Sequence, residues 1–262
     1  METHLAAAGL AKERGADVIA FPELGLTGYL LKDLTYEVAC RLTDPPIERL
    51  LQASAEIDIL FSFIEEGPDH RFYVAAVYAA DGRIAHVHRK LYLPTYGLFE
   101  EGRHVARGGE LDSFAMKGGA RAGMMICEDA WHVSVPYLLA LSGADILFIP
   151  AAGPGRALGG DPNSGAQAFW ERMLRTYAQL FSCYIIFVNR VGFEDGLFFF
   201  GHSFAVAPDG EIVSRTETHE RALGMVDIDL EAVRRERYRT PLLRDEDVHL
   251  TLRTLARLAE RR

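Results

Sequence analysis

The chain has 262 residues, of which 49% are hydrophobic and 25% are charged, a composition typical of a globular protein with a substantial core. Its formal net charge of -9 argues against nucleic acid and anionic membranes as main partners. The three cysteines lie far apart without C-x-x-C spacing, and the sequence contains neither a signal peptide nor an apolar run of membrane-spanning length, so we expect a cytoplasmic protein.

Apolar periodicity predicts helices and strands throughout the first half of the chain. Helices are expected over 2–14 and 44–54. Asp81-Gly82 lies between two apolar runs and is typical of a hairpin turn, and Gly118-Gly119 predicts a second hairpin. The strands predicted in this half are 17–21, 57–64, 72–80, 83–89, 111–116 and 120–126.

The second half continues the pattern and ends in an amphipathic tail. Its predicted helices are 135–142 and 165–181, and its predicted strands are 145–150, 184–189, 198–207, 211–215 and 223–228, with a hairpin around 208–210. A tail helix over about 241–262 carries apolar residues that either pack on their own domain or contact another subunit, and the sequence favours neither. Because no linker or repeat interrupts the chain, we expect one α/β domain over 1–262, with mixed sheets covered by helices.

Three chemically active side chains each follow a predicted strand: Glu23, Lys90 and Cys127. Each residue could instead have no catalytic role: Glu23 as an acid in a loop, Lys90 as a surface lysine and Cys127 as an inert buried thiol. Together they are the minimum set for covalent hydrolysis. The thiolate attacks, the carboxylate takes and returns the proton, and the lysine with a backbone N–H after the cysteine stabilises the oxyanion.

Two loops are candidates for the walls of a pocket. Residues 91–103 form an aromatic-rich loop. Residues 153–160 are glycine-rich but fit neither the phosphate-binding loop nor the dinucleotide fingerprint, so we interpret them as a flexible rim.

The motifs around these residues resemble the nitrilase superfamily of carbon–nitrogen hydrolases, in the family's order and over nearly the whole chain. The resemblance implies that Glu23 is the general base, Lys90 the oxyanion-stabilising residue and Cys127 the nucleophile. It further implies that Glu101 is the second glutamate, which positions the lysine. The similar segments are 21–29 (FPELGLTGY), 88–94 (HRKLYLP), 126–131 (ICEDAW), 189–192, 201–204 and 242–245.

The resemblance also implies a fold and an assembly. The family fold is a four-layer α-β-β-α sandwich of two mixed sheets, it commonly dimerises through helices beside the cysteine, and its chemistry needs no metal or organic cofactor. The family begins with a core strand before its first helix, whereas this sequence begins in the helix. We therefore expect the first strand to be missing and the start to be incomplete.

Within the superfamily, the residues after Cys127 and the segment 93–99 resemble the glutaminase domains of glutamine-dependent NAD synthetases, whose residues matching Tyr96 and Glu128 help bind glutamine. Two departures favour a freestanding amidase: the chain ends without an ATP-binding domain, and 151–154 departs from the glutaminase pattern. We expect cleavage of a small linear amide through a cysteine thioester, releasing ammonia or an amine. The candidate substrate-binding residues are Tyr96, Phe99, Glu128, Trp131 and His202.

Several alternatives remain open from the sequence. The chain could be the glutaminase subunit of a split NAD synthetase, a nitrilase acting through a thioimidate, or an N-carbamoyl hydrolase. A catalytically silent interaction protein on the same scaffold is a different class, and the intact carboxylate, lysine and thiol argue against it. The expected partners are a small-molecule amide and further copies of the chain, as a homodimer or higher homo-oligomer.

Overall fold

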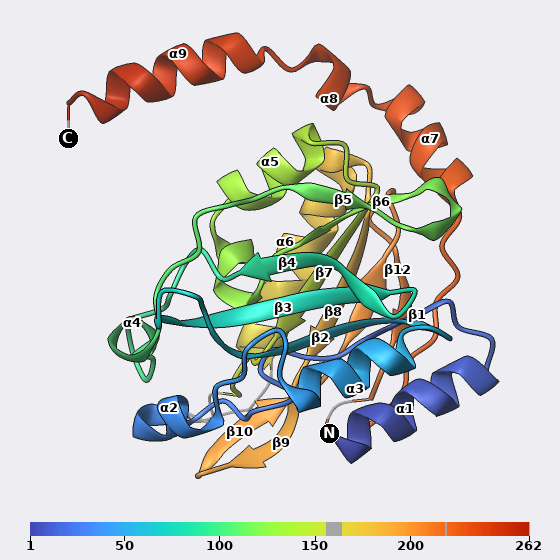
Figure 1. The fold of residues 1–262 in the computed structure, drawn as a ribbon. Helices are drawn as coiled ribbons and strands as arrows, with labels where there is room; N and C mark the ends of the chain where they lie inside the picture. Colours follow the sequence, from blue (N-terminus) through green and yellow to red (C-terminus); the bar gives the residue numbers. More distant parts are fainter. Residues whose placement is uncertain (156–163, 218, 262) are drawn as a thin grey trace.

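The computed structural model describes residues 1–155, 164–217 and 219–261, and two large sheets form its centre (Figure 1). The first sheet has the order β1-β2-β3-β4. Its strand β1 is parallel to β2, whereas the other neighbours are antiparallel, so the sheet is mixed, with β1 at one edge. The strands are β1 (Val18–Ala20), β2 (Asp58–Glu66), β3 (Phe72–Ala80) and β4 (Arg83–Arg89).

The second sheet has six strands in the order β12-β11-β8-β7-β6-β5. Its central strands β6, β7 and β8 are parallel, and the strands beyond them on both sides are antiparallel. The strands are β5 (Ser113–Ala115), β6 (Arg121–Met124), β7 (Ile146–Ala151), β8 (Tyr184–Asn189), β11 (Phe204–Val206) and β12 (Ile212–Arg215).

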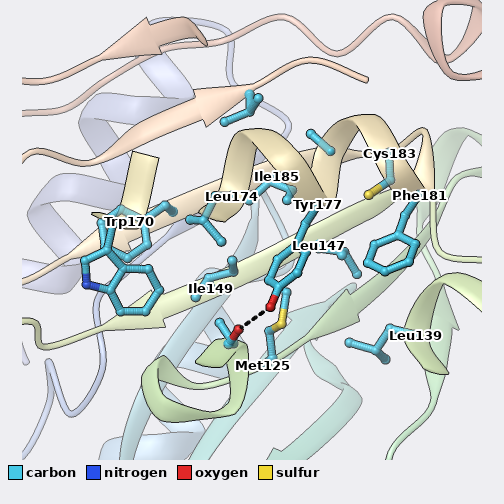
Figure 2. Close-up of a cluster of buried hydrophobic side chains, with 14 of the residues drawn as sticks. Met125, Leu139, Leu147, Ile149, Trp170, Leu174, Tyr177, Phe181, Cys183 and Ile185 are labelled. Carbon is cyan, nitrogen blue, oxygen red and sulfur yellow. Dashed lines mark hydrogen bonds between the residues drawn. The ribbon is translucent and has the colours of Figure 1, made fainter. Parts of the chain in front are cut away.

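Three apolar cores separate four layers. Between the sheets, Leu60 and Tyr78 belong to the same cluster as Met124 and Phe148. Helices α1 (Glu2–Glu13) and α3 (Pro45–Ala53) share a core with the outer face of the first sheet. Helices α5 (Ser134–Leu141) and α6 (Ser164–Phe181) share another with the second sheet, where Leu174 and Tyr177 lie over Leu147 (Figure 2). The predicted α-β-β-α sandwich of two mixed sheets is confirmed.

The strand sequences follow from this layering. Strands β2 and β3 are buried along nearly their whole length, because one face meets the other sheet and the opposite face meets helices. Continuous apolar runs are the pattern expected of such strands. The β3–β4 hairpin turns at Asp81 and Gly82, whose φ angles of 52° and 73° are those of a tight type I′ turn.

The strand predicted over 198–207 is wrong. Residues 197–200 form β10, which pairs with β9 (Val191–Glu194) in a separate two-stranded sheet, and β11 begins only at Phe204. Gly201 and His202 both have positive φ, at 68° and 56°, so the backbone turns between the two strands. The Asp195-Gly196 turn within the β9–β10 hairpin is a sequence signal that the single-strand interpretation overlooked.

The strand predicted over 223–228 is also wrong. These residues have no regular secondary structure, although the Ser214 hydroxyl donates to the Met225 carbonyl. An apolar run alone does not make a strand, since a strand also needs a neighbour for its backbone groups.

The tail departs from a single helix. It is divided into α8 (Leu242–Asp245) and α9 (Val248–Ala259), and α7 (Leu230–Arg239), which the sequence did not predict, precedes it. Asp247 ends the preceding segment and caps α9 by accepting the Leu250 N–H. Helix α9 lies away from the sheets (Figure 1), and none of its residues is buried. Its larger apolar residues are 45–63% exposed: Val248, Leu250, Leu252, Leu255 and Leu258. None of the described helices combines the length and apolarity needed to cross a lipid bilayer.

The core beneath α6 gives a test of the layering. Leu147 is fully buried, whereas Leu10 on α1 is 42% exposed. We expect Leu147→Ala to lower the free energy of unfolding by about 2–5 kcal/mol, because it leaves a cavity between β7 and α6. Leu10→Ala should change it by less than about 0.5 kcal/mol. Chemical denaturation of both variants measures the difference, and equal losses would contradict the assignment of this core.

Candidate active site

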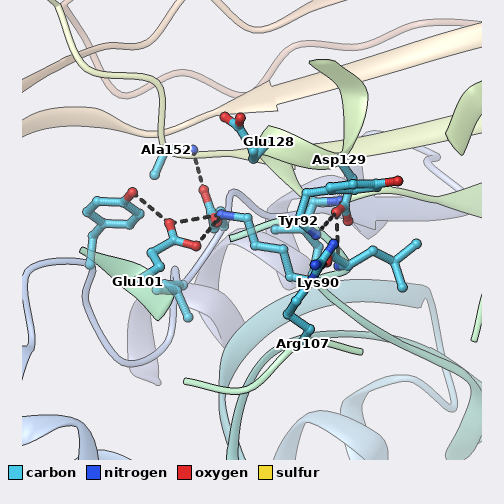
Figure 3. Close-up of polar contacts among 12 residues, drawn as sticks. Lys90, Tyr92, Glu101, Arg107, Glu128, Asp129 and Ala152 are labelled. Carbon is cyan, nitrogen blue, oxygen red and sulfur yellow. Dashed lines mark hydrogen bonds and ion pairs between the residues drawn. The ribbon is translucent and has the colours of Figure 1, made fainter. Parts of the chain in front are cut away.

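The residues that follow three strands converge in one buried cluster. Glu23 comes three residues after β1, Lys90 directly after β4, and Cys127 three residues after β6. The Lys90 side chain is fully buried, and its Nζ donates to Glu23 Oε1 at 2.7 Å. It also donates to Glu101 Oε1 at 2.9 Å and lies 2.8 Å from Glu101 Oε2 (Figure 3). The ammonium thus holds two carboxylates together.

The backbone fixes Lys90 in this position. Its N–H donates to the Val74 carbonyl and its own carbonyl accepts the Gly108 N–H. A Cβ on residue 108 would lie 2.2 Å from the Arg89 carbonyl oxygen, so only glycine allows the chain to pass so close to the end of β4.

Glu23 is fully buried and hydrogen-bonded on both oxygens. Lys90 binds Oε1, and the Ala152 N–H donates to Oε2 at 2.9 Å. The pKa of Glu23 is raised to about 7, mainly by burial. The charge of Lys90 acts to lower this pKa, and the charge of Glu101 acts to raise it. A hydrogen bond with the Cys127 side chain favours the ionised form. A carboxylate with this pKa is suited to accept and return protons near neutral pH.

Cys127 opens a short 3-10 helical turn, η3 (Cys127–Trp131). Its φ of 45° lies in the left-handed region, which is strained for a residue with a side chain. Burial and the charge of Glu23 raise the pKa of the thiol well above its ordinary value, while Lys90 and the Ala152 N–H act to lower it. The resting sulfur is therefore a thiol, and its activation needs a neighbouring base.

Lys90 remains cationic in this cluster. Burial acts to lower the pKa of its ammonium, but the charges of Glu101 and Glu23 outweigh burial and raise the pKa well above its ordinary value. The cluster therefore combines a fixed positive charge with a carboxylate that titrates near neutrality.

Tyr29 is a site residue that the sequence analysis did not single out. Its hydroxyl donates to Glu101 Oε1 at 2.8 Å, so it orients the second glutamate. Burial and the charge of Glu101 raise the pKa of Tyr29. Glu194 Oε1 accepts the N–H groups of Tyr29 and Leu30 and ties this loop to the β9–β10 hairpin. The 21–29 motif contains Tyr29, but residue spacing in the sequence does not predict its contact with Glu101, 72 residues away.

Three of the five candidate substrate-binding residues lie around the loop that carries Glu101. Tyr96 donates its hydroxyl to Glu128, 2.9 Å from Oε2, and its ring contacts Phe99 edge to face. Burial raises the pKa of Glu128, an effect that the Tyr96 hydroxyl opposes. A cavity of about 570 Å³ is lined by Tyr92, Tyr96, Arg107, Glu128 and His132 among others.

The other two candidates contact helix α6. The Trp131 ring stacks on Phe169 at 4.5 Å. His202 is buried, and its Nε2 lies 2.7 Å from Glu171 Oε1 and 2.8 Å from Gln167 Nε2. The contacts of both residues therefore join loops to α6. The glycine-rich rim predicted over 153–160 lies partly outside the described residues, since 156–163 are not among them.

No group of three or more His, Cys, Asp or Glu side chains within 1–155, 164–217 and 219–261 could hold a metal ion.

The chain is similar to known proteins in both sequence and structure. A family model described as Carbon-nitrogen hydrolase matches residues 1–238. The chain is 27% identical over 224 residues to the glutamine-dependent NAD(+) synthetase of Acinetobacter baylyi, a match that covers 86% of this chain and 40% of that protein. The chain thus spans about two fifths of the length of that synthetase.

Two further similarities cover nearly the whole of both chains. The N-carbamoylputrescine amidase of Solanum tuberosum is 26% identical over 265 residues, covering 94% of this chain and 86% of that one. The crystal structure of a carbon-nitrogen hydrolase from Helicobacter pylori G27 superposes with a TM-score of 0.81 at 25% identity, covering 96% of this chain and 90% of that one.

The electrostatics of the cluster predict how the reactivity of Cys127 depends on pH. Because Glu23 with a pKa of about 7 must be ionised to take the thiol proton, alkylation of Cys127 by iodoacetamide should speed up as pH rises through about 7 and then level off. Glu23→Gln should slow alkylation and remove this rise. Peptide mass spectrometry from pH 5.5 to 8.5 measures both. A wild-type rate that rises only above pH 8, as for an ordinary thiol, would contradict the assignment.

Proposed function

The chain belongs to the carbon–nitrogen hydrolase family, and from this premise we propose that it is an amidase that cleaves the C–N bond of a small linear amide through a thioester on Cys127. One observation carries the proposal. The buried Glu23 carboxylate accepts from Lys90 Nζ at 2.7 Å and also hydrogen-bonds the Cys127 side chain. A nucleophile, its base and a cation for the oxyanion are therefore in contact in one cluster.

In the proposed first step, Glu23 takes the Cys127 proton as the sulfur attacks the amide carbonyl carbon. The carbonyl oxygen becomes an oxyanion, stabilised by Lys90 and by a backbone N–H that follows Cys127. An ammonium has three N–H donors, so Lys90 can hold two carboxylates and still turn one donor to the oxyanion. Glu101 and Tyr29 keep the ammonium in place.

Collapse of the tetrahedral intermediate breaks the C–N bond. Glu23 returns its proton to the leaving nitrogen, which departs as ammonia or an amine and leaves a thioester on Cys127. Water then attacks the thioester with Glu23 again as the base, and the carboxylic acid leaves with the thiol restored. A free reactive thiol of this kind fits a reducing, cytoplasmic compartment.

A panel of amides tests the proposal. Cys127→Ala should lower kcat for the best amide by at least about 10⁴-fold while the circular dichroism spectrum and Tm stay close to wild type. The wild type should form an adduct on Cys127 with the mass of the acyl group when quenched during turnover. Turnover that persists in the alanine variant would disprove the role of the thiol.

A glutaminase is the second candidate, and the Tyr96–Glu128 contact favours it. Glu128 presents a half-buried carboxylate beside the cavity, a partner for a substrate ammonium group. The similarity to glutamine-dependent NAD(+) synthetases supports this assignment, and glutamine therefore belongs in the panel with N-carbamoyl amines and nitriles. Preference for glutamine by more than about tenfold, lost in Glu128→Gln, would favour the glutaminase over the general amidase.

We also propose that the chain forms a homodimer or a higher homo-oligomer. Helix α9 leaves Leu252 and Leu255 at 63% and 59% exposure, and α5 leaves Leu138 at 49%. Exposed leucines gathered on one helix are typical of a surface that another subunit covers.

Light scattering on the purified chain tests this assembly. The wild type should have the mass of a dimer or more, and Leu252→Glu with Leu255→Glu should shift it towards the monomer. Arg253→Glu changes charge on the same helix and should leave the mass unchanged. A monomeric wild type at about 50 μM would contradict the proposal.

A further inference from the structure

One buried carboxylate joins the segment that carries Lys90 to the segment that carries Cys127. Asp129 has no exposed surface, and four donors surround it. Its Oδ1 accepts the backbone N–H groups of Leu91 and Tyr92, both at 2.9 Å (Figure 3). Its Oδ2 accepts the Ile126 N–H and lies 2.9 Å from His88 Nε2.

The donors to Asp129 are neighbours of Lys90 and Cys127 in the sequence. His88 comes two residues before Lys90, while Leu91 and Tyr92 directly follow it. Ile126 directly precedes Cys127. Asp129 therefore hydrogen-bonds residues on both sides of Lys90 and the residue immediately before Cys127. Hydrogen bonds to a buried charged acceptor are short and strong, and their loss is costly because the carboxylate has no access to water.

Asp129 also closes the turn around the nucleophile. Its own N–H donates to the Ile126 carbonyl at 2.9 Å, so Asp129 binds both backbone groups of the residue before Cys127. Cys127 itself has a φ of 45°. A strained conformation of this kind costs about 1–3 kcal/mol and persists only where surrounding contacts over-determine it. The two contacts of Asp129 supply that constraint.

His88 completes the arrangement from the first sheet. It lies on β4, is 2% exposed, and among the described residues is the one side chain hydrogen-bonded to the Asp129 carboxylate. Asp129 follows β6 in the second sheet, so the His88–Asp129 contact is a polar link between the two sheets beside the reactive groups.

From these contacts we propose that Asp129 and His88 are positioning residues for the proposed hydrolysis. They do not touch the substrate. They set the distance between the Lys90 ammonium and the Cys127 sulfur and hold Cys127 in its strained backbone conformation. The proposal rests on the proposed function for its effect on turnover, but its effect on the reactivity of Cys127 does not depend on which substrate is used.

The test compares His88→Leu, His88→Gln and Asp129→Asn with the wild type. His88→Leu removes the donor, whereas His88→Gln keeps an N–H that can reach Asp129. His86→Leu is the matched control, because His86 lies on the same strand and stacks on Phe114 instead. Circular dichroism and Tm first establish that each variant is folded.

Two readouts follow on the folded proteins. The first is the iodoacetamide labelling rate of Cys127 relative to Cys40, a half-buried thiol that serves as an internal reference in every variant. The second is kcat and KM on the best amide. Misplacement of reacting groups by about 1 Å costs on the order of 100-fold in rate. We expect His88→Leu and Asp129→Asn to lower the labelling ratio and kcat by about 10–100-fold with KM within about threefold.

His88→Gln should recover most of the loss, and His86→Leu should leave both readouts near wild type. If folded His88→Leu keeps the wild-type labelling ratio and kcat and loses only thermal stability, the residues have a purely structural role and the inference is overturned. If the wild type hydrolyses no amide in the panel, the proposed function fails, while the labelling ratio still decides this inference. If Asp129→Asn does not fold, the two His88 variants decide it alone.

Discussion

A buried ammonium shared by two carboxylates is the interaction on which the site depends. Removing an ion from water costs several kcal/mol, and that cost is offset only when geometry and hydrogen bonding are good. Here Lys90 contacts Glu23 and Glu101 at 2.7–2.9 Å, and Ala152 and Tyr29 bind the carboxylate oxygens from other sides. The loop after β1, the end of β4 and the start of α4 (Glu101–His104) must therefore meet at one point. The sandwich of two sheets is the scaffold that brings them there.

The same charges determine the chemistry. Burial raises the pKa of Glu23 to about 7 and that of Cys127 well above its ordinary value, so a neutral thiol faces a carboxylate that can take its proton. Lys90 stays cationic because both carboxylates stabilise it. A permanently ionised cysteine is thus unnecessary, and the nucleophile forms when the substrate carbonyl is attacked. Without the lysine, two carboxylates would lie close together in a dry site and would favour protonation over base catalysis.

The sequence predicted the parts of this structure that depend on local patterns. Apolar runs located the strands before Glu23, Lys90 and Cys127, and Asp81-Gly82 located a hairpin, because burial and turn geometry act on neighbouring residues. Glu101 was reached only through a family resemblance, since it starts a four-residue helix within a loop. The contact of His88 with Asp129 joins residues 41 apart and has no local signature. The strand expected over 198–207 was wrong because pairing partners in two different sheets divide it at Gly201 and His202.

A double-mutant cycle between Glu23 and Lys90 tests the central interaction most directly. The free energy of unfolding would be measured at pH 8, where Glu23 is mostly ionised, for Glu23→Gln, Lys90→Met and the double variant. We predict that Lys90→Met is destabilised by about 3–5 kcal/mol, since it leaves two buried carboxylates without a cation. Glu23→Gln should be destabilised by less, since Glu101 still pairs with Lys90. The double variant should lose at least about 2 kcal/mol less than the sum of the two. Losses that add within about 0.5 kcal/mol would mean that the two side chains do not interact, and would contradict the account.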